Sequence, residues 1–250
     1  MKVDGRNRCA VEIAQGRTRV VAGAGSNSTD RAIELTMRAE RAGADAVLSV
    51  VPYYNKPMQE GVAAHFRAIA ASTALPMILH DIPARTVREL TDTTLSRLAE
   101  SAQFIGLLDG TCNIARPARL RPRLPPNFRL RTGDDATASA YMTAGGHGCV
   151  SAVANIVPVL CRALHTYQLQ PIAELLAADH PAALKCALAL LGLIRPDTRL
   201  PLVPLDGTAK SLVEAAIADL SDEILVSPRR ALPATPVQDR AYNRLPGDRL

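Results

Sequence analysis

Residues 77–86 read MILHDIPART, and this stretch decides the fold. The apolar run Met77–Leu79 stops at His80 and Asp81, and a proline turn then leads to Arg85. A short, bounded apolar run is typical of a strand buried in a parallel sheet. Polar side chains that follow such a strand lie at the sheet edge where α/β proteins place their chemistry.

The polar residues of this stretch have a functional and a structural interpretation. His80 can transfer protons near neutral pH, and the planar guanidinium of Arg85 matches a carboxylate or phosphate group. Alternatively, His80 and Asp81 share a hydrogen bond at the strand end, and Arg85 is a solvated surface residue. The spacing alone leaves both interpretations open.

Strand and helix patterns alternate on both sides of this stretch. We expect strands at residues 20–24, 46–51, 77–79, 104–108, 128–132 and 148–152. We expect helices at residues 7–16, 32–42, 61–72, 91–100, 136–144, 153–176, 180–193 and 208–220. Strands joined by helical crossovers form parallel sheets, so the chain is predicted to be an α/β protein with six strand–helix units.

The length and composition predict one main domain. A chain of 250 residues with 48% hydrophobic residues is long enough for a single α/β barrel, predicted here for residues 1–225. Residues 226–250 are rich in proline and arginine and are expected to form a disordered tail. Because this tail carries +3 of the net charge of +5, the remainder lacks the basic character of a nucleic-acid-binding protein.

The five cysteines are scattered and form no CxxC pair, which argues against a zinc site or a redox dithiol. Scattered cysteines without an evident disulfide framework fit a reducing, cytoplasmic setting. The first residues, MKVDGRNRC, lack the apolar core of a signal peptide, and no run of 18 apolar residues occurs. We therefore expect a cytoplasmic protein that does not bind membranes.

Glycine-rich turns follow several of the expected strands. Residues 23–28, GAGSNS, contain the first two glycines of a dinucleotide-binding fingerprint but not the third, so a plain tight turn is the better interpretation. The stretches GDD at 133–135 and GGHG at 145–148 would let a ligand approach the backbone closely, but each is weak evidence alone.

Six motifs follow one another along the chain: VVAGAGSNST (20–29), VVPYYNKPMQEG (50–61), LHDIPART (79–86), RTGDDATA (131–138), GGHGCVS (145–151) and RLPLVPL (199–205). Taken together and in register, over about residues 17–220, they resemble the dihydrodipicolinate synthase / N-acetylneuraminate lyase family. The resemblance implies a (β/α)8 (TIM) barrel and a pyruvate-dependent class I aldolase. The PYYNKP segment favours the synthase branch, whose reaction joins pyruvate to aspartate semialdehyde for lysine and diaminopimelate synthesis.

The resemblance also implies roles for individual residues. Arg85 inherits the binding of the pyruvate carboxylate, and Val150 falls at a position that contacts pyruvate. Tyr54 matches a tyrosine that reaches into the neighbouring subunit as part of a proton relay, which implies a homodimer or homotetramer. His80 replaces a tyrosine that normally transfers protons. The inherited mechanism needs no metal or organic cofactor.

The sequence departs from the family at the residue that forms the covalent bond. The family carries a Schiff-base lysine at the end of one strand, and Leu108 occupies this position in FIGLLDG (104–110). An alkyl side chain cannot attack a carbonyl, and none of the four lysines, Lys2, Lys56, Lys185 and Lys210, is a plausible substitute. Lys56 falls in a loop, and Lys185 and Lys210 fall on expected helices. We expect impaired catalysis; the alternative is a non-catalytic protein that binds 2-oxo acids or associates with an active relative.

A second departure lies at the start of the chain. The first two strands of the family and its GTTGE motif have no counterpart in Met1–Thr18. The barrel is therefore expected to be incomplete, with open edges at residues 20–24 and 148–152. The alternative is that DNA upstream of Met1 encodes the missing segment.

Overall fold

The computed structural model describes residues 2–163, 166–178, 181–220 and 225. The chain divides into two compact units, Met1–Ala152 and Val153–Leu250. The predicted extent of the main domain, residues 1–225, stays a prediction. The expected disordered tail at 226–250 lies outside the described residues.

The first unit is built on a parallel sheet of five strands in the order β1-β2-β3-β4-β5, which is also their order along the chain. The strands are β1 (Val21–Gly23), β2 (Ala46–Val50), β3 (Met77–Asp81), β4 (Phe104–Asp109) and β5 (Arg129–Thr132). Adjacent parallel strands with crossovers in sequential order are the arrangement of an α/β barrel wall. The predicted α/β class with a parallel sheet is therefore confirmed.

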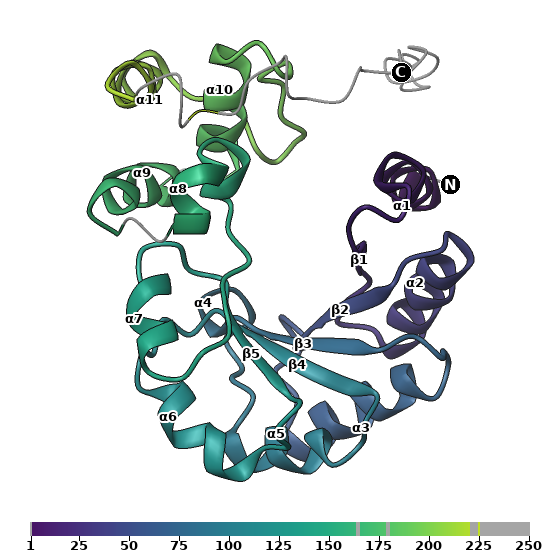
Figure 1. Ribbon diagram of the computed structural model, residues 1–250. Helices are drawn as coiled ribbons and strands as arrows, with labels where there is room; N and C mark the ends of the chain where they lie inside the picture. The colour runs from purple at the N-terminus through teal and green to yellow at the C-terminus, as the bar shows by residue number, and fades with distance from the viewer. Residues whose placement is uncertain (1, 164–165, 179–180, 221–224, 226–250) are drawn as a thin grey trace, which may run out of the picture. The chain divides into compact units, whose positions relative to one another are not determined.

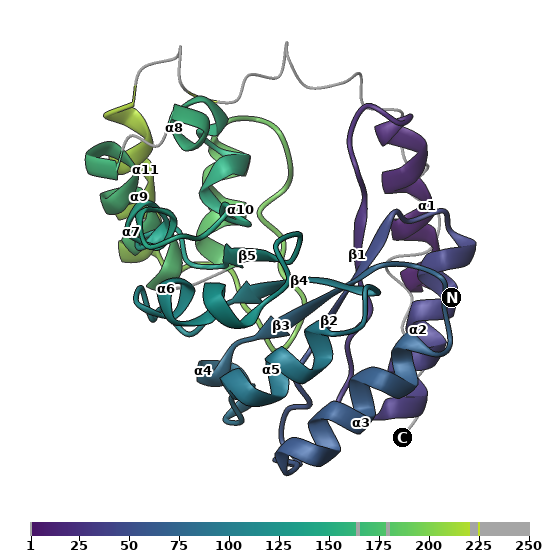
Figure 2. The ribbon, with the colours of Figure 1, turned by 60° about the horizontal axis from the view of Figure 1, so that its bottom comes forward.

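Helices cover one face of this sheet, as Figures 1 and 2 show for α2, α3 and α5. The helical segments of the unit are α1 (Lys2–Ala14), α2 (Thr29–Arg41), α3 (Gln59–Ala70), α4 (Pro83–Thr86), α5 (Asp92–Ala99), α6 (Arg116–Leu120), the 3-10 turn Arg121–Arg123 and α7 (Ala138–Thr143). Ser28 caps α2 by accepting a hydrogen bond from the Arg31 amide, and Thr91 caps α5 in the same way from Thr94. The polar residues before α2 and α5 therefore fix where these two helices begin.

The alternation of side chains along each strand separates two faces. Val47, Leu79, Leu107 and Leu130 point into the core between sheet and helices and are fully buried. The residues between them point to the other face, which we call the inner face. Because the strands are parallel and in register, each row of the inner face draws one residue from each neighbouring strand.

A one-residue bulge in β4 determines which residues of this strand face inward. Met77 pairs with Phe104 but the next residue, Ile78, pairs with Gly106, so Ile105 is the extra residue. Gly106 is required there, because a Cβ atom would lie 2.5 Å from the Arg129 carbonyl oxygen.

The sixth expected strand, at residues 148–152, is wrong as a full strand. Only an isolated parallel bridge joins Thr132 to Cys149, supported by hydrogen bonds from Thr132 to the Gly148 carbonyl and from Val150 to the Thr132 carbonyl. Gly148 has a φ of +153°, which interrupts regular strand geometry. The sheet therefore has five strands and one bridged segment within the described residues.

The second unit is helical in its described part. It contains the 3-10 turn Val153–Asn155, α8 (Pro158–Ala163), α9 (Thr166–Ala178), α10 (Ala182–Leu190) and α11 (Gly207–Ala218). The expected helix at 153–176 is therefore interrupted, because Pro158 starts a new helix rather than continuing one. The Asp206 side chain caps α11 by accepting a hydrogen bond from Ala209 at 2.8 Å.

A buried arginine joins the carboxyl ends of β3 and β4 on the helix-covered face. Arg116, at the start of α6, has no exposed surface and lies 2.8 Å from Asp81 and 3.1 Å from Asp109. It also donates a hydrogen bond to the Leu90 carbonyl at 2.6 Å. The predicted alternative of a hydrogen bond between His80 and Asp81 is wrong, since adjacent strand residues point to opposite faces and Asp81 instead accepts from Leu90 and pairs with Arg116.

Asp81 and Asp109 share the guanidinium of Arg116. Asp109 also accepts hydrogen bonds from the Tyr141 hydroxyl and from Thr111. Asp81 has fewer partners, and its burial raises its pKa to about 6, against the opposing attraction of Arg116. Asp81 therefore binds a proton more readily in the folded chain than a carboxyl group does in water.

We predict that Arg116→Met strongly destabilises the chain. The substitution leaves two buried carboxylates without their cation, which costs about 3–5 kcal/mol of unfolding free energy. Arg97→Met is the matched control, because Arg97 makes an ion pair with Glu60 on the surface, where solvent weakens the attraction between the two charges. Urea unfolding at neutral pH measures both, and equal losses for the two variants would contradict the assignment.

The raised pKa of Asp81 predicts the pH dependence of stability. A carboxyl group that binds its proton more tightly in the folded state lowers the unfolding free energy as pH rises from the unfolded pKa, near 4, through about 6. Relative to Asp81→Asn, the unmodified chain should therefore lose stability between about pH 4 and pH 7. The pKa of Asp45 is lowered by the Val20 amide and Arg19, so Asp45→Asn should show no relative change above about pH 5.

Candidate active site on the inner face of the sheet

The register places four side chains in one row of the inner face. Val50 pairs with His80, His80 with Leu108, and Leu108 with Arg131. Neighbouring strands in a sheet lie about 5 Å apart, so each member of the row is next to the following one. The structure thus brings together two of the five predicted site residues, His80 and Leu108.

His80 lies half-buried on β3, one residue before the buried Asp81. Burial lowers the pKa of its imidazole below the usual value, so the ring is neutral at pH 7. A neutral imidazole both donates and accepts a hydrogen bond, as a proton-transfer group requires. On the sheet it lies directly beside Leu108, and its role in proton transfer stays a prediction.

Leu108 occupies the centre of the row and is 5% exposed. Its side chain offers no atom that can donate, accept or attack. None of the five strands that the structure describes carries a lysine, since Lys2, Lys185 and Lys210 lie on α1, α10 and α11 and Lys56 lies in the segment between β2 and α3. At position 108 the inner face therefore presents hydrocarbon rather than an amine.

The other three predicted residues lie beyond the carboxyl ends of the strands. Arg85 is exposed on the short helix α4, directly after β3, which agrees with either of its two interpretations. Tyr54 follows β2 with a φ of +71° and is 89% exposed. Val150 is 54% exposed in the segment bridged to β5.

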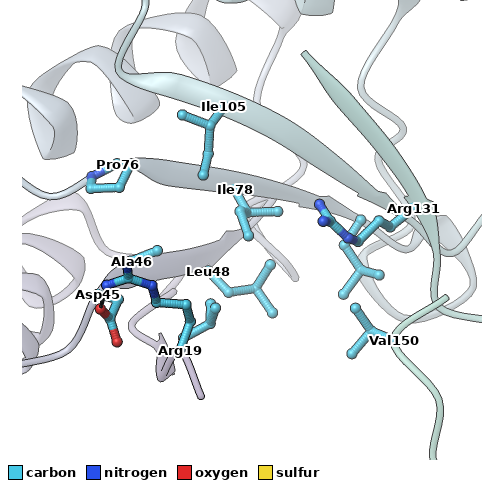
Figure 3. A pocket seen from close by; sticks show the side chains of 11 residues that line it. Arg19, Asp45, Ala46, Leu48, Pro76, Ile78, Ile105, Arg131 and Val150 are labelled. Atoms are coloured by element: carbon cyan, nitrogen blue, oxygen red, sulfur yellow. Dashed lines mark hydrogen bonds and ion pairs between the residues drawn. The ribbon is translucent and has the colours of Figure 1, made fainter. Parts of the chain in front are cut away.

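A cavity of about 600 Å³ opens on the inner face within the first unit (Figure 3). Apolar side chains from β1 to β4, together with Val150, form most of its wall, and Leu108 is among them. Arg19 and Asp45, joined by an ion pair of 2.6 Å, lie at one end of the view, and Arg131 with Val150 lies at the other. Leu108 and Val150 therefore border one cavity, as their predicted shared role requires.

Arg131 is the main residue of this region that the sequence analysis missed. It lies within the motif RTGDDATA, next to Leu108 in the sheet, and points into the cavity. A signal was present, because Arg129 and Arg131 flank the apolar Leu130 with strand periodicity, which places both charges on one face. The buried Arg116 gave no such signal, since it begins a segment interrupted by prolines.

The described part of the chain contains neither a cluster of metal-binding side chains nor a membrane-spanning helix. Residues 2–163, 166–178, 181–220 and 225 contain no group of three or more histidine, cysteine or acidic side chains placed to hold a metal ion. Among the helices described, none has both the length and the apolar character needed to span a bilayer.

The sequence and the fold match one group of known proteins. The Dihydrodipicolinate synthetase family matches residues 7–220. The 4-hydroxy-tetrahydrodipicolinate synthase of Laribacter hongkongensis is 48% identical over 222 residues, covering 83% of this chain and 76% of its own. That of Thiobacillus denitrificans is 46% identical over 225 residues, covering 84% and 76%.

Solved structures of the same group share the fold. Dihydrodipicolinate synthase DapA-2 from Bacillus anthracis aligns with a TM-score of 0.83 at 30% identity, covering 88% of this chain and 80% of its own. The chloride-inhibited enzyme from Acinetobacter baumannii, complexed with pyruvate, aligns with a TM-score of 0.81 at 36% identity, covering 87% and 80%. These matches confirm the predicted barrel family, and the chain belongs to the Dihydrodipicolinate synthetase family.

Proposed function

We propose that the chain is a 4-hydroxy-tetrahydrodipicolinate synthase-like protein that binds pyruvate but is impaired in the covalent step. The relatives named above carry that function in their names, and one of them is a complex with pyruvate. The observation that carries the impairment is Leu108, which faces the inner side of β4 directly beside His80. The inherited reaction joins pyruvate to aspartate semialdehyde through an imine that needs an amine at this position.

The loss of the amine outweighs the other changes. Removal of a covalent nucleophile lowers the rate by many orders of magnitude, whereas removal of one proton-transfer group costs about 10²–10⁴-fold. His80 can still act as a proton donor or acceptor in this proposal. Arg85 binds the substrate carboxylate, and Val150 contacts the substrate at the border of the cavity.

The second candidate is a non-catalytic protein that binds 2-oxo acids or pairs with an active relative. Leu108 favours it, and so does Tyr54, whose ring is 89% exposed in the single chain. An exposed tyrosine is suited to reach a neighbouring subunit, as the family resemblance implies for a homodimer or homotetramer. Both candidates place the protein in the cytoplasm, which agrees with five cysteines that form no disulfide in the described residues.

We predict that Leu108→Lys restores covalent capture of pyruvate. Borohydride reduction in the presence of pyruvate should give no adduct with the unmodified chain and an adduct at residue 108 with the variant, because burial at this position keeps a fraction of the amine neutral. Peptide mass spectrometry locates the adduct.

Ile105→Lys is the matched control for that experiment. It places an amine on the same strand and in the same cavity but outside the row that contains His80. It should trap pyruvate much more slowly than Leu108→Lys. An adduct on the unmodified chain, at Lys56 for example, would contradict the proposed impairment.

We predict that Arg85→Ala weakens pyruvate binding about tenfold or more, the effect expected from loss of hydrogen bonds to a charged group. Isothermal titration calorimetry measures it, with Arg97→Ala as the control because Arg97 pairs with Glu60 on the surface. Equal pyruvate affinity in the unmodified chain, Arg85→Ala and Arg97→Ala would contradict the assignment of Arg85 to the pyruvate site.

A further inference from the structure

The cavity on the inner face carries one uncompensated cation. Of its three charged side chains, Arg19 and Asp45 neutralise each other through their 2.6 Å ion pair. Arg131 makes neither a hydrogen bond nor an ion pair with its guanidinium in the part of the chain that the structure describes. The cavity therefore has a net charge of +1 located at Arg131.

The rest of the wall is almost entirely hydrocarbon. Leu48, Ile78 and Ile105 line it from three successive strands, and Leu108 continues the same surface beside Arg131. Figure 3 shows Ile78, Leu48 and Arg131 directed into a common space. In this space the guanidinium lies at one end of an apolar floor, with Val150 nearby.

The size and charge of the cavity define a ligand class. A volume of about 600 Å³ falls within the range of sites that bury small organic molecules. A half-buried guanidinium favours a carboxylate, which it can bind through two parallel hydrogen bonds. The apolar floor favours an acid whose hydrocarbon body is longer than the methyl group of pyruvate.

We propose that this cavity binds a carboxylic acid with an extended apolar chain. Its carboxylate is held by Arg131, and its chain lies over Leu48, Ile78 and Ile105 toward the Arg19–Asp45 pair. Leu108 has a part in this site that a lysine could not have, because its side chain extends the apolar floor up to Arg131. The inference goes beyond the proposed function and depends on neither Arg85 nor an imine.

The test is calorimetric titration of the full chain with hexanoate, octanoate and decanoate below their micellar concentrations. Affinity should rise about three- to fourfold for each added methylene, because each one transfers apolar surface from water to the cavity. Decyltrimethylammonium has a chain of the same length and the opposite charge, and it should bind at least tenfold more weakly than decanoate.

Arg131→Gln should weaken decanoate binding at least tenfold, the loss expected for a charge-assisted pair. Arg129→Gln is the matched control, because Arg129 lies on the same strand two residues away, is exposed and does not line the cavity. It should bind decanoate within about twofold of the unmodified chain. Circular dichroism establishes that both variants are folded.

Two results would overturn the proposal. One is equal loss of decanoate affinity in Arg131→Gln and Arg129→Gln, which would indicate general attraction to a basic surface. The other is equal binding of decanoate and decyltrimethylammonium, which would indicate apolar adsorption without carboxylate recognition. Neither result bears on pyruvate binding, which Arg85→Ala and Leu108→Lys test separately.

Discussion

The buried ion pairs of Arg116 determine which side chains face the inner side of the sheet. Asp81 and Asp109 end β3 and β4, pair with each other in the ladder and are both held by this guanidinium on the helix-covered face. Since alternate strand residues point to opposite faces, fixing these two carboxylates outward fixes His80 and Leu108 inward. The geometry of the candidate site thus depends on charges that lie on the other face of the sheet.

This separation of roles lets the inner row differ in chemistry without a change in the core. The core packing involves residues such as Val47, Leu79 and Leu107, none of which belongs to the inner row. The Leu108 side chain lies on the inner face, and the outward-facing contacts of β4 are made by Leu107 and Asp109. The core residues lie on the helix-covered face and the candidate site lies on the inner face, so a substitution in the site can leave the core packing intact.

Much of the fold was predictable because local signals and tertiary structure agree. The apolar run at Met77–Leu79, the polar residues around Ser28 and the turn at Gly43 predict a strand, a helix start and a helix end that the structure contains. The segment at 148–152 was predicted as a strand because its composition fits one. The positive φ at Gly148 and its position beyond the last full strand reduce it to a single bridge.

The site was less predictable, because its important contacts join distant parts of the sequence. Leu108 was recognised from its motif, but nothing in the sequence indicates that Arg131 is its neighbour on the next strand or that Arg116 is buried. The pairing of Arg116 with two carboxylates requires knowledge of which residues end adjacent strands. Charged residues in a proline-interrupted segment otherwise suggest a solvated surface.

The bulge at Ile105 decides which side chains of β4 face the inner side of the sheet. The extra residue shifts the phase of β4, so that Leu108 faces inward and Asp109 outward. Pairing the same residues without the bulge would exchange these two positions, placing the acid on the inner face away from Arg116 and turning Leu108 toward the helices. The irregularity in β4 therefore keeps the buried acid and the inner-row residue on opposite faces of one short strand.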